Sequence, residues 1–208
     1  MKNENARYIL TLTTICLVAA SLLTGVYFLT NPRILQQKAQ QEKQALTEVF
    51  PRAGYFEPVT KDGQVTHFKA YTSLDKKRLL GYAFRAEAQG YASVIETMAG
   101  VDTKGVITGI TVLAQNETPG LGAQIEQVLV NKTLWQKIKE LFAGEKTPQD
   151  PIQPWFCAQF TGKEIKDLIV VRSPGAKNIQ AITGATISSR ALTVSVREKA
   201  KQVLEHER

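Results

Sequence analysis

The stretch Ile182-Thr183-Gly184-Ala185-Thr186-Ile187-Ser188-Ser189 organises the interpretation of this chain. It carries little side-chain bulk, and Gly184 can adopt a positive φ and let another group approach the backbone. Residues 190–208 follow with one apolar helical face, made of Leu192, Val196, Ala200 and Val203. The hydroxyl groups therefore lie at or just before a helix start. Free N–H groups and the positive end of the helix dipole favour a phosphate there.

A simpler interpretation of the same stretch is a helix cap. Thr183, Thr186 or Ser188 could accept a hydrogen bond from the first turn and do nothing else. Small-residue turns before helices are common, so the local sequence alone leaves both interpretations open.

The segment Glu117-Thr118-Pro119-Gly120-Leu121-Gly122 follows directly on a predicted strand, 106–113. Proline and two glycines cannot continue a strand, and loops held by a rigid sheet are where binding residues concentrate. The alternative is a plain connection into a helix over 123–140. Such a helix would bury Ile125, Val128, Leu129, Leu134, Trp135, Ile138 and Leu141.

The region from residue 67 to residue 113 is rich in strand patterns. Alternating or β-branched runs predict strands over 67–71, 79–86, 92–101, 106–113 and later 168–171. Residues 75–77 form a turn, 54–58 form a turn-rich entry, and 144–154 form a loop with three prolines. His67 alternates within its strand and is interpreted as structural. The fold class is α+β, a mixed α/β domain with a mostly antiparallel sheet.

Residues 8–30 contain no charged side chain and are long enough to cross a bilayer as a helix. A cleaved signal peptide is the competing interpretation, but its small-residue site, 19–21, falls in the middle of the apolar run. We therefore expect a short N-terminus at 1–7, an uncleaved transmembrane helix at 8–30 that contacts the lipid bilayer, and a helical stalk at 31–50. Pro32 ends the span.

Composition excludes several functions. The 208 residues carry a formal net charge of +7, but lysines and arginines are interspersed with acids, so no nucleic acid partner is expected. Two cysteines, of which Cys16 lies in the apolar run, predict no disulfide. Two histidines without a cysteine cluster predict no metal centre and no haem held by paired ligands. A redox group would have to be held by other means.

Two motifs resemble a known family. Thr183–Thr186 resembles the Ser/Thr-Gly-Ala-Thr flavinylation motif of the FMN-binding domain family, and Glu117–Gly122 is identical to its Glu-Thr-Pro-Gly-Leu-Gly signature. The resemblance implies that Thr186 carries FMN covalently through a phosphoester. It places Thr183, Gly184 and Ala185 along the cofactor and Lys163 near the ring or phosphate. The ring would face Glu117, Thr118, Gly120, Leu121 and Gly122. Trp155, in the segment before Lys163, fits a ring contact or the core equally well.

Over its whole length the chain is similar to the G subunits of Rnf ion-translocating electron-transport complexes. The resemblance implies an electron carrier without a substrate site of its own, bound to the other membrane subunits and loaded by a separate flavin transferase. The charges that flank the span do not decide its orientation. The resemblance implies that the domain over 51–208 is extracytoplasmic. The related C subunit of the Na⁺-translocating NADH:quinone reductase is one alternative, although it usually has a longer region before the domain. A membrane-tethered scaffold without cofactor is the other. No nucleophile with a base partner supports a hydrolase.

Overall fold

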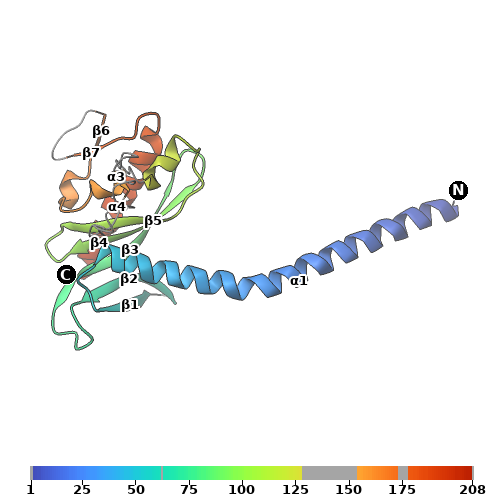
Figure 1. Ribbon diagram of the computed structural model, residues 1–208, viewed down its shortest axis with the longest axis horizontal. Helices are drawn as coiled ribbons and strands as arrows, with labels where there is room; N and C mark the ends of the chain where they lie inside the picture. Colours follow the sequence, from blue (N-terminus) through green and yellow to red (C-terminus); the bar gives the residue numbers. More distant parts are fainter. Residues whose placement is uncertain (1, 62, 128–153, 173–177, 208) are drawn as a thin grey trace, which may run out of the picture. The chain divides into compact units, whose positions relative to one another are not determined.

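The computed structural model describes residues 2–61, 63–127, 154–172 and 178–207, with side chains from residue 7 onward (Figure 1). The chain divides into two compact units, Met1–Lys43 and Gln44–Arg208. The first contains most of one long helix. The second contains the sheet, the remaining helices and the last turns of the long helix.

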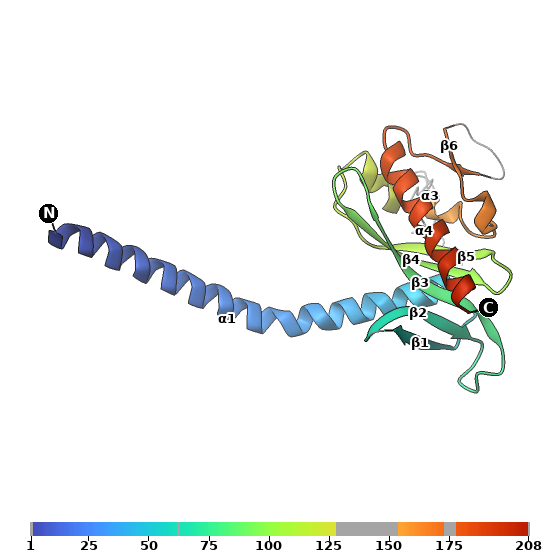
Figure 2. The ribbon, with the colours of Figure 1, turned by 180° about the vertical axis from the view of Figure 1, so that it is seen from behind.

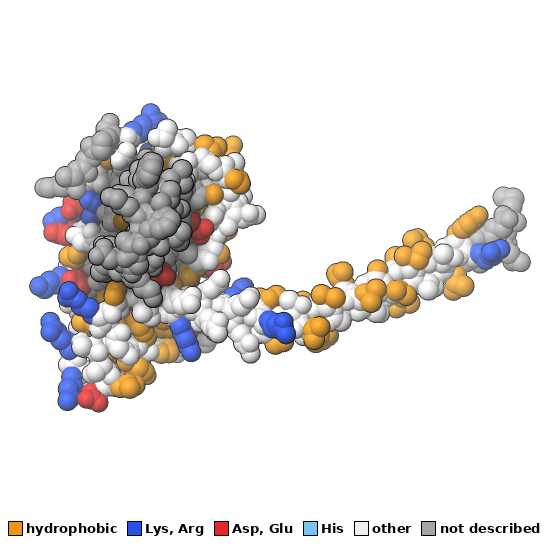
Figure 3. All heavy atoms as spheres, in the orientation of Figure 1, with side chains coloured by type: hydrophobic (Ala, Val, Ile, Leu, Met, Phe, Trp, Pro, Cys, Tyr) orange, Lys and Arg blue, Asp and Glu red, His pale blue; other side chains and the backbone are white. Residues whose placement is uncertain are grey.

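Helix α1 runs from Lys2 to Val49 with Pro32 inside it (Figures 1 and 2). The helix thus continues through Pro32 into the segment that was predicted to be a helical stalk. A proline removes one backbone hydrogen bond and displaces one carbonyl group. A long helix can accommodate both changes by bending at the proline. Hydrophobic side chains are exposed along the first unit, with Leu23 77% and Leu29 78% accessible (Figure 3). An 18-residue window of mean hydropathy 2.1 makes this helix long and apolar enough to cross a membrane.

The second unit is built on a five-stranded antiparallel sheet in the order β1-β2-β3-β4-β5. The four strands predicted between residues 67 and 113 are confirmed, with ends shifted by a few residues. The prediction of a turn over 54–58 is wrong, because Tyr55–Lys61 forms the edge strand β1. An edge strand has one side without a ladder and so tolerates Pro58. The strands are β1 Tyr55–Lys61, β2 Gln64–Tyr71, β3 Leu79–Gln89, β4 Val94–Asp102 and β5 Ile107–Ala114.

The C-terminal part supplies short elements and one long helix. The predicted helix over 123–140 is wrong within the described residues: only a short 3₁₀ turn, η1, forms there, and Gln127 after it is in an extended conformation. The rest of that helix, and the 144–154 loop before Pro154, lie outside the described residues. The elements are η1 Gly122–Glu126, α3 Trp155–Ala158, η2 Ile165–Asp167, β6 Val170–Val171, β7 Ile179–Gln180 and α4 Thr186–His206. Strands β6 and β7 pair in parallel.

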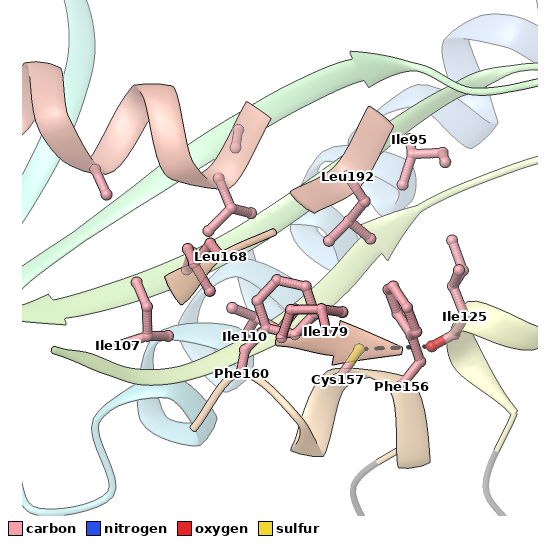
Figure 4. Close-up of a cluster of buried hydrophobic side chains, with 14 of the residues drawn as sticks. Ile95, Ile107, Ile110, Ile125, Phe156, Cys157, Phe160, Leu168, Ile179 and Leu192 are labelled. Carbon is pink, nitrogen blue, oxygen red and sulfur yellow. Dashed lines mark hydrogen bonds between the residues drawn. The ribbon is translucent and has the colours of Figure 1, made fainter. Parts of the chain in front are cut away.

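Helix α4 covers one face of the sheet. The predicted apolar face is confirmed, since Leu192, Val196, Ala200 and Val203 are all buried. They pack with aromatic and aliphatic side chains from β3, β4, β5 and α3 (Figure 4). Cys157 lies in this core with its Sγ 3.5 Å from the Ile125 carbonyl oxygen. Burial raises the pKa of its thiol to about 12, so it offers no thiolate chemistry at neutral pH.

The other face of the sheet is covered by the end of α1. Ala45, Leu46, Val49 and Phe50 pack there against side chains of β2, β3 and β4. Thr111 on β5 donates a hydrogen bond of 2.8 Å to the Glu48 carboxylate. The C-terminal end of the long helix is therefore part of the core of the second unit. Within β2, His67 is buried with Nε2 3.1 Å from Glu207 Oε1, in keeping with a structural role.

Two leucines of α1 form a matched pair that tests this packing. Leu46 is 5% exposed and Leu35 is 59% exposed. We expect Leu46→Ala to lower the free energy of unfolding by about 2–5 kcal/mol, because it opens a cavity against the sheet. Leu35→Ala should change it by less than about 0.5 kcal/mol. Denaturant unfolding of the full chain in detergent measures both, and equal effects of the two changes would contradict the packing of α1 on the sheet.

Candidate functional site

Three segments that are distant in sequence meet at one end of the sheet. They are the turn between β3 and β4, the segment after β5 and the first turn of α4 (Figure 2). Together they enclose a cleft of about 400 Å³. Its lining consists of Tyr91, Glu117, Thr118, Leu121, Gly122, Gly184, Ala185, Thr186, Ile187 and Ser188.

The buried carboxylate of Glu117 ties these segments together. It is 5% exposed, and its oxygens accept hydrogen bonds from three successive backbone N–H groups of the β3–β4 turn. The donors are Tyr91 at 3.3 Å, Ala92 at 3.0 Å and Ser93 at 2.9 Å. The Ser188 hydroxyl on α4 donates a further bond of 2.7 Å. One side chain therefore fixes the turn and the helix start relative to each other.

The environment of Glu117 favours its ionised form. Burial by itself raises the pKa of a carboxyl group, but the Ser188 hydroxyl and the turn N–H groups donate to the charged form and stabilise it. The net result is a pKa below the ordinary value of 4.5. Glu117 is thus a structural anion at neutral pH.

Gly122 is required by the same network. A Cβ on Gly122 would collide with the Glu117 carboxylate and would lie 3.0 Å from the Ser188 hydroxyl oxygen. The last glycine of the Glu-Thr-Pro-Gly-Leu-Gly segment therefore makes room for the first glutamate of that segment. Gly184, in the second motif, has a φ of 80°, which a residue with a side chain rarely adopts.

The four hydroxyls of the 182–189 stretch fall into two classes. Ser188 and Ser189 are fully buried, and Ser189 donates to the Ala185 carbonyl oxygen at 2.9 Å. Thr183 is exposed and Thr186 is half-buried. The hydroxyls accessible to a ligand are therefore those of Thr183 and Thr186, and of the two only Thr186 lines the cleft.

The capping interpretation of this stretch is wrong. Helix α4 begins at Thr186, the residue before it is Ala185, and no side chain caps the helix. The N–H groups of the first turn have no partner within the helix. They and the helix dipole face a position that suits an anion.

A second cleft, of about 540 Å³, adjoins the first at Thr186 and Ile187, which line both. It runs along α4 and is lined also by Ala88, Gln89, Arg190, Ala191, Val194 and Ser195. Arg190 lies one helical turn after Thr186, so both side chains are on the same side of α4. Arg190 and Glu117 carry the charges among the residues that line the two clefts.

Most of the predicted site residues lie together at this cleft. Thr186, Gly184, Ala185, Glu117, Thr118, Leu121 and Gly122 all line it. Thr183 and Gly120 are exposed in the two adjoining turns without lining it. Lys163 is the exception: its carbonyl oxygen accepts a hydrogen bond from the Ile107 N–H, at the start of β5, whereas Glu117 follows the end of that strand. Trp155 packs against the main core.

Sequence reasoning missed three residues of this site. Ser188 is the internal partner of Glu117, Tyr91 lies at the mouth of the cleft, and Arg190 follows Thr186 at helical spacing. If the helix start had been placed at Thr186, the i, i+4 rule would have predicted that Arg190 lies on the same side of the helix as Thr186. Nothing in the sequence connects Tyr91 or Ser188 to Glu117, because those contacts are tertiary.

The residues present fit a flavin phosphate better than a metal ion. In the described ranges, no group of three His, Cys, Asp or Glu side chains is placed to share a metal. The cleft instead combines an accessible hydroxyl at a helix N-terminus with exposed apolar surface. Tyr91 is 72% exposed, Leu121 45% and Ile187 58%. A planar ligand esterified at Thr186 would cover such surface.

Comparison with known proteins agrees with this geometry. The model of the FMN-binding domain family matches residues 90–201, and that of the RnfG N-terminal region matches residues 1–49. The chain is 30% identical to the G subunit of the proton-translocating ferredoxin:NAD(+) oxidoreductase complex of Clostridium ljungdahlii. That alignment covers 97% of this chain and 94% of the relative. It is 32% identical to the G subunit of the Na(+)-translocating complex of Acetobacterium woodii, over 90% of this chain and 86% of the relative.

The fold is also similar to a solved structure. This is the C subunit of the Na(+)-translocating NADH-quinone reductase from Parabacteroides distasonis, with a TM-score of 0.50 and 17% sequence identity. The match covers 83% of this chain and 96% of the other. At this level of identity the likeness shows a shared fold.

Proposed function

The chain belongs to the FMN-binding domain family, among the G subunits of Rnf-type complexes, and we propose from this that it carries electrons through an FMN esterified to Thr186. The complex is proposed to be a membrane-bound, ion-translocating ferredoxin:NAD oxidoreductase. When bound, FMN supplies reversible electron transfer, and that chemistry belongs to the cofactor. The protein's task is to hold it, orient it and control the access of water and partners.

The observation that supports this proposal most strongly is the position of Thr186. Of the four hydroxyls in its motif, Thr186 alone is both accessible and part of the cleft. It is the first residue of α4, so N–H groups of the first helical turn face an esterified phosphate. The apolar side chains of Leu121 and Ile187 provide contact for a flat ring in the same cleft.

Loading of Thr186 is proposed to require a separate flavin transferase. A threonine hydroxyl is a weak nucleophile that needs an adjacent base. No histidine or cysteine is among the residues that line the two clefts. Glu117 does line one of them, but its carboxylate already accepts hydrogen bonds from Ser188 and from the β3–β4 turn.

Arg190 is proposed to neutralise the phosphodiester, whereas the resemblance placed Lys163 near the ring or phosphate. We expect Arg190→Glu to slow flavin incorporation about tenfold, equivalent to about 1.4 kcal/mol, by placing a repelling charge beside the phosphoryl group. Arg190→Lys should keep most of the rate. Lys201→Glu, the same charge reversal near the other end of α4, is the control. The loading rates are followed by flavin fluorescence in denaturing gels. Equal rates for Arg190→Glu and Lys201→Glu would contradict the role of Arg190.

The protein is membrane-associated, in view of its similarity to Rnf G subunits and its long apolar helix. We propose further that residues 8–30 cross the bilayer once and that the domain lies on the extracytoplasmic side. A covalent bond suits that location, because an FMN that dissociated there could not be recaptured from a cellular pool. The other membrane subunits of the complex are the proposed partners.

Complementation tests the function. Membranes of cells that lack this chain should lose ferredoxin-dependent NAD⁺ reduction and regain it with the wild-type chain. The same chain, tagged and extracted in mild detergent, should bring the other subunits with it. Full activity without the chain would refute the proposed carrier role, and NADH:quinone activity in place of ferredoxin oxidation would favour the alternative of a quinone-reductase complex.

A further inference from the structure

Tyr91 is a large aromatic residue whose side chain is exposed to solvent on a hydrogen-bonded turn. Its side chain is 72% exposed although it lines the cleft. The turn that carries it is fixed from inside, because Tyr91, Ala92 and Ser93 all donate backbone hydrogen bonds to Glu117. The Gly90 N–H also bonds to the Ser93 carbonyl oxygen at 2.8 Å. The exposure of Tyr91 therefore belongs to an ordered turn.

Tyr91 does not serve the hydrophobic core. The side chains of β3 and β4 on either side of the turn enter the core at Ala86 and Ile95. Tyr91 shares its cleft with Leu121 and Ile187, two other apolar side chains that are about half exposed. These three come from three separate segments, and Glu117 holds two of the segments to α4. The cleft thus has apolar surface from three separate segments.

We propose that the Tyr91 ring packs against the isoalloxazine ring of the flavin and covers it from solvent. Aromatic side chains stack on planar heterocycles with little dependence on exact chemistry, as they do on nucleic acid bases. The proposal makes Tyr91 a cofactor-binding residue and Glu117 the residue that positions it. It rests on the proposed function, since it requires a flavin at Thr186.

Flavin fluorescence reports this contact directly. A phenol in van der Waals contact with an excited flavin quenches its emission by transferring an electron, which then returns, so no net chemistry occurs. The phenyl ring of phenylalanine stacks equally well but does not donate the electron. Tyr91→Phe therefore removes the quenching by electron transfer and keeps the packing, whereas Tyr91→Ala removes both.

The experiment uses the full chain loaded by a flavin transferase in cells and purified in detergent. Emission in denaturing gels measures how much flavin each variant carries, and emission of the native protein is then expressed per flavin. We expect Tyr91→Phe to be brighter than wild type with unchanged accessibility to iodide. Tyr91→Ala removes the stacked ring, so its flavin should be both brighter per flavin and more accessible to iodide than in wild type. Tyr55→Phe, at the opposite end of the sheet from the turn, should match wild type.

The possible failures are distinguishable. If Tyr91→Phe and wild type emit equally per flavin, the stacking proposal is wrong while the flavin at Thr186 stands. If Tyr91→Ala fails to fold or load, the comparison of Tyr91→Phe with wild type still decides. If the wild-type chain is dark in the denaturing gel despite an active transferase, the proposed function fails, and the role of Tyr91 fails with it.

Discussion

Thr186→Ala is expected to abolish covalent flavin, leaving a colourless chain in which no fluorescence survives denaturation. The reason is geometric as well as chemical. Ser188 and Ser189 are buried and engaged in hydrogen bonds, so they cannot replace the lost hydroxyl. Thr186 itself is half-buried and caps nothing, so its loss should change the free energy of unfolding by less than about 1 kcal/mol.

Two neighbouring changes serve as controls for this prediction. Thr186→Ser keeps a hydroxyl at the first position of α4 and should keep the flavin. Thr183→Ala removes the other accessible hydroxyl of the motif, which does not line the cleft, and should also keep it. In-gel fluorescence of all three variants, each produced with a flavin transferase, makes the comparison. If Thr186→Ala still carried covalent flavin, or if Thr183→Ala were the variant that lost it, the acceptor would be Thr183 and the account of Thr186 would be wrong.

Glu117→Gln is expected to have the second largest effect, and it acts on folding. The amide keeps the shape of the side chain, but its NH₂ group now faces donors that bonded to a carboxylate oxygen. Buried groups left without partners cost about 1–3 kcal/mol each. Because the turn N–H groups can partly rehydrate, we expect a loss of about 2–4 kcal/mol in the free energy of unfolding. Glu126→Ala, which removes an exposed carboxylate nearby, should cost less than about 0.5 kcal/mol.

The pH dependence of Glu117 provides an independent check. Its folded-state pKa lies below the ordinary value of 4.5, because the Ser188 hydroxyl and the turn N–H groups outweigh the effect of burial. Such a group contributes stability fully above its unfolded pKa and loses it as the pH falls through the folded pKa. The stability difference between wild type and Glu117→Gln should therefore be constant near neutrality and shrink below about pH 4.5. A difference that grew on acidification would contradict the network.

Much of the fold could be predicted from local patterns. The buried face of α4 and the strands between residues 67 and 113 follow from periodicity alone. Strand β1 was missed because Gly54 and Pro58 suggest a turn, and only its place at the sheet edge makes Pro58 acceptable. Helix α1 continues through Pro32 into the predicted stalk, because a proline weakens a helix locally without forbidding its continuation.

The candidate site was predictable in part. The two motifs meet at one cleft, as the family resemblance implied, and the family itself is confirmed. The role of Glu117 could not be seen in the sequence, because its partners lie 24 to 71 residues away in the chain. Lys163 seemed suitable by charge, but its backbone lies at the start of β5, whereas Glu117 follows the end of that strand, and Arg190 is the cation that lines the cleft next to Thr186.

The central claim is that FMN is esterified to Thr186, and peptide mass spectrometry tests it most directly. The chain is produced with a flavin transferase, denatured and digested, and the peptide that contains residues 182–189 is fragmented. The account predicts an added mass equal to FMN less one water, carried by Thr186. The same mass on Thr183 or a serine, or an unmodified peptide from protein made with an active transferase, would contradict it.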